Sequence, residues 1–339
     1  MSTSGRARFL SIMAHESDHS GFWHGDPNHA SIHTINAHFH VEDDFALGLM
    51  LRSDCRWVMP EKFGVWPHKA PMFDVLGGVA RHSLGQDGFF ADCEDVAEVE
   101  AFPWPDPADC DFTDTLKEID RTIEAGQAVL SGMWSCFFHV VADFFGMENY
   151  FIKMYTDPDV VLAVTNHVTD FYLRANERLF ALAKDRIDAF FFGNDFGSQR
   201  DLLVSPEFFD RFVMPSFVKF TEQAHRHGYR SLLHSCGAIE RVIPRLLDAG
   251  VDALHPIQAR AANMDAETLA KKYRDRAVFV GGLDTQHLLP FGTPAQVKEE
   301  VRRLRELFGP NFILSPSHES ILPNVPMANI EAMAEAAAL

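Results

Sequence analysis

The triplet His234-Ser235-Cys236 places an imidazole and a thiol two residues apart, directly after the apolar run 229–233. In an extended strand, side chains two residues apart point to the same face. Histidine nitrogen and cysteine thiolate are both zinc ligands, at bond lengths of about 2.0 to 2.3 Å. We expect His318, in the segment Ser315-Pro-Ser-His318, to supply a third ligand. The alternative interpretation is a half-buried histidine beside an inert cysteine.

Composition and charge exclude several classes of protein. The chain has 339 residues, 47% of them hydrophobic, and a formal net charge of −18. Such an acidic surface repels phosphate backbones and anionic membranes, so we expect no nucleic-acid or membrane partner. No stretch approaches the roughly 20 apolar residues that cross a bilayer, and the first residues do not read as a secretory signal. The five cysteines are odd in number and far apart, which favours a reducing, cytoplasmic setting.

Short apolar runs alternate with long amphipathic stretches through the C-terminal two-thirds of the sequence. This alternation is typical of a parallel sheet covered by helices. We predict strands at 56–59, 127–131, 188–192, 230–234, 251–254, 277–280 and 312–314, and helices at 157–184, 205–227, 239–249, 265–273, 293–308 and 329–338. An eighth strand is not evident from the pattern.

These elements predict an α/β fold, a (β/α)8 TIM barrel with an irregular N-terminal extension. We expect a single domain over 1–339, in which 1–125 form the irregular part and a lid and 126–339 form the regular units. An open doubly wound sheet is the second interpretation, but no Gly-x-Gly-x-x-Gly follows an early strand to support dinucleotide binding.

Polar residues follow several predicted strands. In a TIM barrel the loops after the strands form the active-site face, so these side chains are expected to meet at one mouth. They are Asn194, Asp195, His234, Cys236, His255, Gln258, Asp284, Ser317 and His318.

The N-terminal part is harder to interpret. Residues 15–40 contain seven histidines, and a histidine-rich tract can bind metal. The spacing is irregular, so we expect most of them on the surface or in a lid. The thirty phenylalanines of the chain indicate a thickly packed core, an aromatic-lined pocket, or both.

Several motifs follow one another over roughly residues 125–339. They are His234-Ser-Cys-Gly, Gly281-Gly-Leu-Asp-Thr-Gln286, Gly292-Thr-Pro294, Ser315-Pro-Ser-His318, Val325-Pro326 and Asn329-Ile-Glu-Ala-Met333, together with Gly193-Asn-Asp-Phe-Gly-Ser-Gln199 and Ser205-Pro-Glu207. Together these motifs resemble the uroporphyrinogen decarboxylase superfamily. Within it, the chain is most similar to the zinc-dependent corrinoid or coenzyme M methyltransferase-like branch.

The resemblance implies a (β/α)8 barrel with one of two chemistries: cofactor-free decarboxylation of a porphyrinogen, or zinc-dependent methyl transfer with a corrinoid protein or a thiol. In the methyltransferases both residues of the His-x-Cys pair bind zinc. Their third ligand is a cysteine in a Pro-Gly-Cys segment, where this chain has Pro316-Ser317-His318. Histidine is also a zinc ligand. The decarboxylases carry an arginine-rich N-terminal motif, Arg-Gln-Ala-Gly-Arg, that this sequence lacks. Asp54 could stand for their substrate-binding aspartate, but a surface aspartate is the interpretation we prefer.

The remaining predicted site residues have supporting roles. We expect Asp195 to orient a ligand or accept a proton, and Trp134 to line a dry pocket. Gln199 and Gln258 could hydrogen-bond a substrate, while Asp284 could orient a metal-binding histidine or cap its own loop. His139 is interpreted as a core histidine.

Three hypotheses follow for the function. The first is a zinc methyltransferase moving a methyl group between a small methylated substrate and a corrinoid protein or thiol. The second is a metal-independent decarboxylase of a small carboxylic acid or porphyrinogen-type substrate. The third is a non-catalytic subunit that binds corrinoid or tetrapyrrole. The chain has no Asp-x-His-x-x-Gly corrinoid motif, so a corrinoid would be carried by a partner protein. A homodimer is left open.

Overall fold

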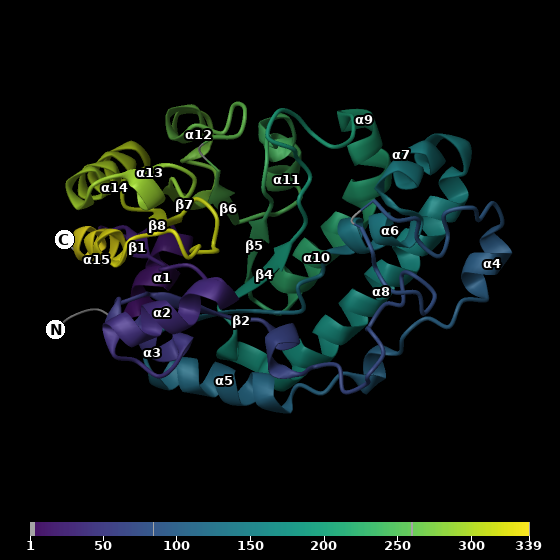
Figure 1. Cartoon of the computed structure of the whole chain (residues 1–339), viewed down its shortest axis with the longest axis horizontal. Helices are drawn as coiled ribbons and strands as arrows, with labels where there is room; N and C mark the ends of the chain where they lie inside the picture. Colours follow the sequence, from purple (N-terminus) through teal and green to yellow (C-terminus); the bar gives the residue numbers. More distant parts are fainter. Residues whose placement is uncertain (1–3, 84, 259, 339) are drawn as a thin grey trace.

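Eight parallel strands form a nearly closed barrel surrounded by helices (Figure 1). The computed structural model describes residues 4–83, 85–258 and 260–338. The strands follow the order β1-β8-β7-β6-β5-β4-β3-β2. They are β1 (Gly21–Phe22), β2 (Cys55–Val58), β3 (Ala128–Ser131), β4 (Ala189–Gly193), β5 (Arg230–His234), β6 (Ala253–Ile257), β7 (Val278–Leu283) and β8 (Phe312–Pro316). The predicted (β/α)8 barrel is confirmed.

Helices alternate with the strands and cover the outside of the barrel (Figure 1). They are α1 (Gly5–Met13), α2 (His29–Phe39), α3 (Asp44–Met50), α4 (Val96–Glu100), α5 (Thr113–Glu124), α6 (Phe137–Phe145), α7 (Met147–Thr156), α8 (Pro158–Ala183), α9 (Pro206–Phe208), α10 (Met214–Arg226), α11 (Ile243–Asp248), α12 (Ala266–Tyr273), α13 (Leu288–Phe291), α14 (Pro294–Phe308) and α15 (Met327–Ala337). None of the helices in the described part of the chain combines the length and the apolar character needed to cross a membrane.

Start signals in the sequence explain where the C-terminal helices begin. Ser205 precedes α9 and accepts a hydrogen bond from the backbone N–H of Phe208. Thr293 and Gln296 form a reciprocal capping box at the start of α14. The helix predicted over 205–227 is interrupted by a π-helical turn at Phe209–Val213 between α9 and α10.

The molecule has one hydrophobic core inside the barrel and another between the strands and the surrounding helices. Strand β4 contributes side chains to both, because consecutive side chains of a strand point to opposite faces. Phe190 and Phe192 stack on each other with ring centroids 4.7 Å apart and face the helix layer. Phe191 points into the barrel, where its ring packs against Trp23, Trp57 and Trp134. Consecutive residues of this phenylalanine run therefore belong to the two layers in turn.

Barrel closure depends on the pair Phe22 and Asp54. The backbone N–H of Asp54 donates to the carbonyl of Phe22 at 2.8 Å, and the N–H of Phe22 donates to Oδ2 of Asp54 at 2.8 Å. Arg8 of α1 donates to the other carboxylate oxygen at 2.7 Å. Asp54 is 2% exposed, so its interpretation as a surface aspartate is wrong: the carboxylate joins the first and second strands.

The N-terminal part is more regular than the sequence suggested. It contributes the first two strands and the helices α1 to α5, and α1 inserts Phe9, Ile12 and Met13 into the barrel core. Strand β1 has only two residues, too few for a periodicity to be recognised. Of the seven histidines in 15–40, His24 is buried against Ser53 and Asp44. The other six are exposed, as expected for most of this tract.

Strand β6 lies three residues later than predicted at its C-terminal end. The sequence predicted 251–254, whereas the strand spans Ala253–Ile257 and includes His255 and Pro256. Proline has no N–H to donate, which makes it a poor strand residue. The ladder with β7 accommodates it through a register shift between Leu254 and Ile257.

A buried carboxyl group connects the ends of β2 and β3. Glu61, in the turn Pro60–Phe63 after β2, accepts a hydrogen bond from the backbone N–H of Trp134 at 2.8 Å. Its Oε2 is buried and has no partner among the described residues. Burial raises the pKa of Glu61 to about 7.

Loss of the Asp54 carboxylate should destabilise the barrel. We expect Asp54→Ala to lower the free energy of unfolding by about 2 to 4 kcal/mol, because Arg8 and the Phe22 N–H lose their shared acceptor. Urea unfolding monitored by circular dichroism measures this. The control Asp275→Ala, at a carboxylate that is 93% exposed, should change stability by less than about 0.5 kcal/mol. Equal effects of the two substitutions would contradict the assigned role of Asp54.

Glu61 should make stability dependent on pH. The folded-state pKa lies above the unfolded one, so the folded protein holds this proton more tightly. The resulting stability is complete below the unfolded pKa of about 4.5 and is lost as the pH rises through 7, on the order of 2 to 3 kcal/mol in total. We therefore expect Glu61→Gln to be more stable than wild type at pH 8, with a smaller difference at pH 5. The exposed Glu124→Gln is the control; a Glu61→Gln difference that is the same at both pH values would refute the effect.

Candidate functional site

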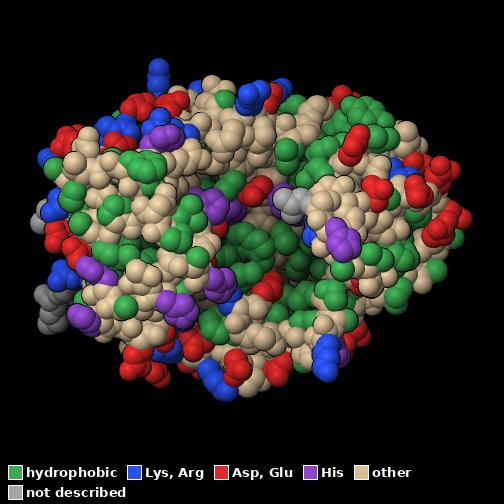
Figure 2. Space-filling view, viewed as in Figure 1, with side chains coloured by type: hydrophobic (Ala, Val, Ile, Leu, Met, Phe, Trp, Pro, Cys, Tyr) green, Lys and Arg blue, Asp and Glu red, His purple; other side chains and the backbone are tan. Residues whose placement is uncertain are grey.

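Polar side chains from several strand ends gather at the C-terminal mouth of the barrel. Asp195 follows β4, His234 is the last residue of β5, and Cys236 comes two residues later. Gln258 and Asp284 follow β6 and β7, and His318 follows β8. Figure 2 shows a hollow near the centre of the face in view, with hydrophobic side chains in its depth and acidic and histidine side chains around it.

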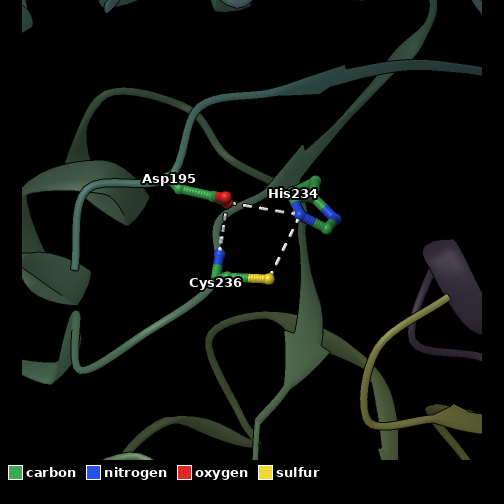
Figure 3. A group of neighbouring side chains, drawn as sticks. All are labelled: Asp195, His234 and Cys236. Atoms are coloured by element: carbon green, nitrogen blue, oxygen red, sulfur yellow. Dashed lines mark hydrogen bonds and ion pairs between the residues drawn. The ribbon is translucent and has the colours of Figure 1, made fainter. Parts of the chain in front are cut away.

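Asp195, His234 and Cys236 form one compact group (Figure 3). Nε2 of His234 lies 3.3 Å from Oδ1 of Asp195 and 3.4 Å from Sγ of Cys236. The same Asp195 oxygen accepts the backbone N–H of Cys236 at 2.8 Å. His139, interpreted from the sequence as a core histidine, is half-buried, and its Nε2 accepts the N–H of Asp195 at 3.1 Å. The carboxylate is therefore fixed where it can orient both His234 and Cys236, the two predicted metal ligands at the end of β5.

A second group meets the opposite nitrogen of the same imidazole. Nδ1 of His234 lies 2.9 Å from Nδ1 of His255 and 3.5 Å from Oε2 of Glu319. Nδ1 of His318 is also 3.5 Å from that Glu319 oxygen. His234, His255 and Glu319 each offer one ligand atom within 4.8 Å of the others, as do Asp195, His234 and Cys236.

The acidic groups around His234 favour a positive charge at the imidazole, either a proton or a metal ion. Burial alone would lower the pKa of His234, but the Glu319 charge and the hydrogen bonds with Asp195 and Cys236 raise it well above its ordinary value. Burial and the neighbouring imidazoles of His234 and His318 lower the pKa of His255. The pKa values of the two imidazoles are thus shifted in opposite directions across the contact between their Nδ1 atoms.

The thiol is activated by its neighbours. Burial opposes ionisation of Cys236, but hydrogen bonds from His234 and His318 lower its pKa below the ordinary value. In return, the hydrogen bond with Cys236 raises the pKa of His318. Thiolate is the form of cysteine that binds metals and acts as a nucleophile.

The donor set fits a divalent metal. It combines thiolate, imidazole and carboxylate ligands, the groups that zinc binds in proteins. Oε2 of Glu319 and Nε2 of His255 are both buried and have no hydrogen-bond partner among the described residues. A buried polar atom without a partner is costly, and coordination of a cation would remove that cost for the carboxylate.

His318 lies beside the predicted metal ligands but outside both compact groups. Its ring centroid is 6.1 Å from that of His234. Neither group of close ligand atoms contains it, whereas Asp195 accompanies His234 and Cys236. The role of His318 as a third ligand stays a prediction.

The structure gives the other predicted site residues different positions. Trp134 packs on His234 with ring centroids 5.2 Å apart. Oε1 of Gln258 accepts the N–H of Gly237 at 2.5 Å, next to Cys236. Asp284 accepts the N–H groups of Gln286 and His287, which fits the loop-cap interpretation. Gln199 is exposed, and its carbonyl accepts the N–H of Ala262.

Sequence reasoning missed two members of the cluster as ligands. His255 was noted only as a polar residue after a strand, although it pairs laterally with His234 in the β5–β6 register. Glu319 was not considered, although it directly follows His318 in the sequence. A search for any His, Cys, Asp or Glu next to a predicted ligand would have found it.

Comparisons with known proteins agree with this architecture. Residues 89–338 match the family model described as uroporphyrinogen decarboxylase (URO-D), so the chain belongs to the uroporphyrinogen decarboxylase family. A solved methyltransferase from Methanosarcina mazei has the same fold, with a TM-score of 0.67, 17% sequence identity and 99% of each chain covered. A search of curated proteins gave no match.

Zinc should bind at this cluster and depend on its two central ligands. Mutation of a residue that hydrogen-bonds a metal ligand typically costs about 10- to 100-fold in metal affinity. Loss of a ligand itself should therefore cost about 100-fold or more. We expect His234→Ala and Cys236→Ser to lose zinc, measured by elemental analysis and competition with a chromophoric chelator. His33→Ala, at an exposed histidine of α2, should retain it. Full zinc content in His234→Ala would contradict the assignment.

Proposed function

We propose that this protein is a zinc-dependent methyltransferase that moves a methyl group between a small methylated substrate and a corrinoid protein or a thiol. The observation that carries the proposal is the position of Cys236. Its thiol is half-buried, has a lowered pKa and contacts an imidazole held by Asp195. Family membership and the fold shared with a methyltransferase are consistent with this chemistry.

In the proposed site, His234 and Cys236 hold zinc, and His318 is the predicted third ligand. Bound zinc would lower the pKa of a thiol acceptor or polarise the group that releases the methyl. Asp195 holds His234 and the Cys236 backbone in position through one carboxylate oxygen. Asp195 is also the proposed proton acceptor. Burial raises the pKa of its carboxyl group, but the contacts with His234 and the Cys236 N–H outweigh burial and hold the pKa below its ordinary value.

The walls of the mouth suit a transfer that must exclude water. Trp134 covers one side of His234, and Trp23 and Phe191 lie 5.2 and 5.5 Å from the His255 ring. A dry, apolar surrounding strengthens the electrostatic interactions inside it. The neighbouring Cys236 thiol raises the pKa of His318, so this imidazole is proposed to hold a proton next to the thiol.

The second candidate is a metal-independent decarboxylase, which the family membership favours. A porphyrinogen carries many carboxylates and needs several cationic partners. Lys62 near the mouth already contacts the carboxylate of Asp26 at 2.6 Å. Arg260 uses only Nε in its contact with Asp284 at 2.9 Å, so it could still bind one carboxylate. These pairs favour a substrate with few carboxylates.

Free methylcobalamin and 2-mercaptoethanol can serve as probes of the proposed activity. We expect the zinc-loaded protein to accelerate the loss of the methylcobalamin spectrum at least about tenfold over buffer, since activating the thiol lowers the barrier by more than about 1.4 kcal/mol. Cys236→Ser and exhaustive chelation should both abolish the acceleration.

Cys93→Ala is the matched control, because this thiol is buried and hydrogen-bonded to the Asp95 carbonyl, outside the cluster. Release of carbon dioxide from a carboxylic acid substrate that survives complete chelation would sink the methyltransferase proposal in favour of the decarboxylase.

A further inference from the structure

A cavity of about 480 Å³ opens beside the metal cluster, between the loops that follow β6, β7 and β8. Its walls include Gln258, Arg260, Thr285, Ser317 and His318. This volume is within the range of about 300 to 1,000 Å³ that is typical of small-molecule sites. We call it the Arg260 pocket.

Two walls of the Arg260 pocket contact the proposed catalytic centre. The ring centroid of His318 lies 6.1 Å from that of His234. Gln258 accepts the N–H of Gly237, the residue after Cys236. A molecule in the pocket would therefore lie against the same segment that carries the thiol.

Arg260 is held so that its outer nitrogens are available. Its Nε donates to Oδ2 of Asp284 at 2.9 Å. Oδ1 of Asp284 is already occupied by the backbone N–H groups of Gln286 and His287, at 2.8 and 3.2 Å. No described residue accepts a hydrogen bond from the two terminal nitrogens of Arg260. A guanidinium fixed through Nε presents these two donors as a planar pair, the geometry that binds a carboxylate in two places.

The other polar groups of the pocket are also able to donate. The oxygen of the Gln258 side chain is used by Gly237, so the amide nitrogen is the end left for a ligand. Thr285 and Ser317 add hydroxyl groups 3.2 Å apart. Among the described residues that line the pocket there is no carboxylate. The neighbouring cluster, in contrast, holds Asp195 and Glu319, which would repel an anion.

We propose that the Arg260 pocket binds the carboxylate of a small organic acid whose other end reaches the metal cluster. Arg260 then determines specificity, Asp284 positions its guanidinium, and Gln258 binds the ligand beside the thiol segment. The second part of the proposal, a reacting end at the metal, rests on the proposed function. The pocket itself does not.

The test uses two thiols of equal chain length, 3-mercaptopropionate and 3-mercapto-1-propanol, titrated into zinc-loaded protein by calorimetry. One charge-assisted contact is worth about tenfold or more in affinity. We expect wild type to bind the acid at least about tenfold more tightly than the alcohol. Arg260→Gln should lose this preference and leave the affinity for the alcohol within about twofold.

Arg276→Gln is the matched control, because Arg276 also pairs with an aspartate, Asp248 at 2.7 Å, and is similarly exposed, but does not line the pocket. It should bind both thiols as wild type does. Arg260 is 53% exposed, so its substitution should not prevent folding, and thermal unfolding of each variant checks this.

The outcomes separate the two proposals. Equal binding of both thiols by wild type, or an unchanged preference in Arg260→Gln, would overturn the Arg260 pocket. A protein that holds no zinc but still prefers the acid through Arg260 would overturn the metal-based function and leave the pocket standing.

Discussion

The imidazole of His234 is held at both nitrogens, and the arrangement of the mouth depends on this. Nε2 faces Asp195 and Cys236, while Nδ1 faces His255 and Glu319. One side chain thus connects groups from the ends of four strands. Three groups that can carry negative charge surround a single ring, and their mutual repulsion is tolerable only with a positive charge among them. A proton on His234 or a bound cation fulfils that requirement.

The apolar interior of the barrel strengthens the electrostatic interactions among these charged groups. Below the cluster, Phe191 packs against Trp23, Trp57 and Trp134, so the ionisable groups stand on an apolar floor. Electrostatic interactions are stronger in such surroundings than in water. The same strand sends Phe190 and Phe192 outward into the helix layer. A run of three phenylalanines thereby supports the site on one face and the attachment of the helices on the other.

The strands and helices that could be predicted from the sequence are those in which apolar residues recur at regular spacing. Five of the seven predicted strands lie within two residues of the observed ones at both ends, and β6 and β7 each extend three residues further than predicted. His234 and Cys236 were selected by the two-residue spacing of side chains on a strand. β1 was missed because two residues carry no period, and β6 was ended too early because of Pro256. The contact between His234 and His255 spans 21 residues of sequence. It arises from the lateral register of two neighbouring strands, which no local pattern encodes.

The seam of the barrel connects the N-terminal segment to the site. The segments that carry β1 and β2 meet through Phe22 and Asp54 and through His24 and Ser53. A few residues further along, the N–H of Asp26 donates to the carbonyl of Glu319 at 2.8 Å. The segment that carries β1 therefore has two roles. It closes the barrel against Asp54, and it holds the backbone of Glu319 at the mouth of the barrel. A change at the contact between Asp26 and Glu319 would therefore act on the carboxylate that lies 3.5 Å from Nδ1 of His234.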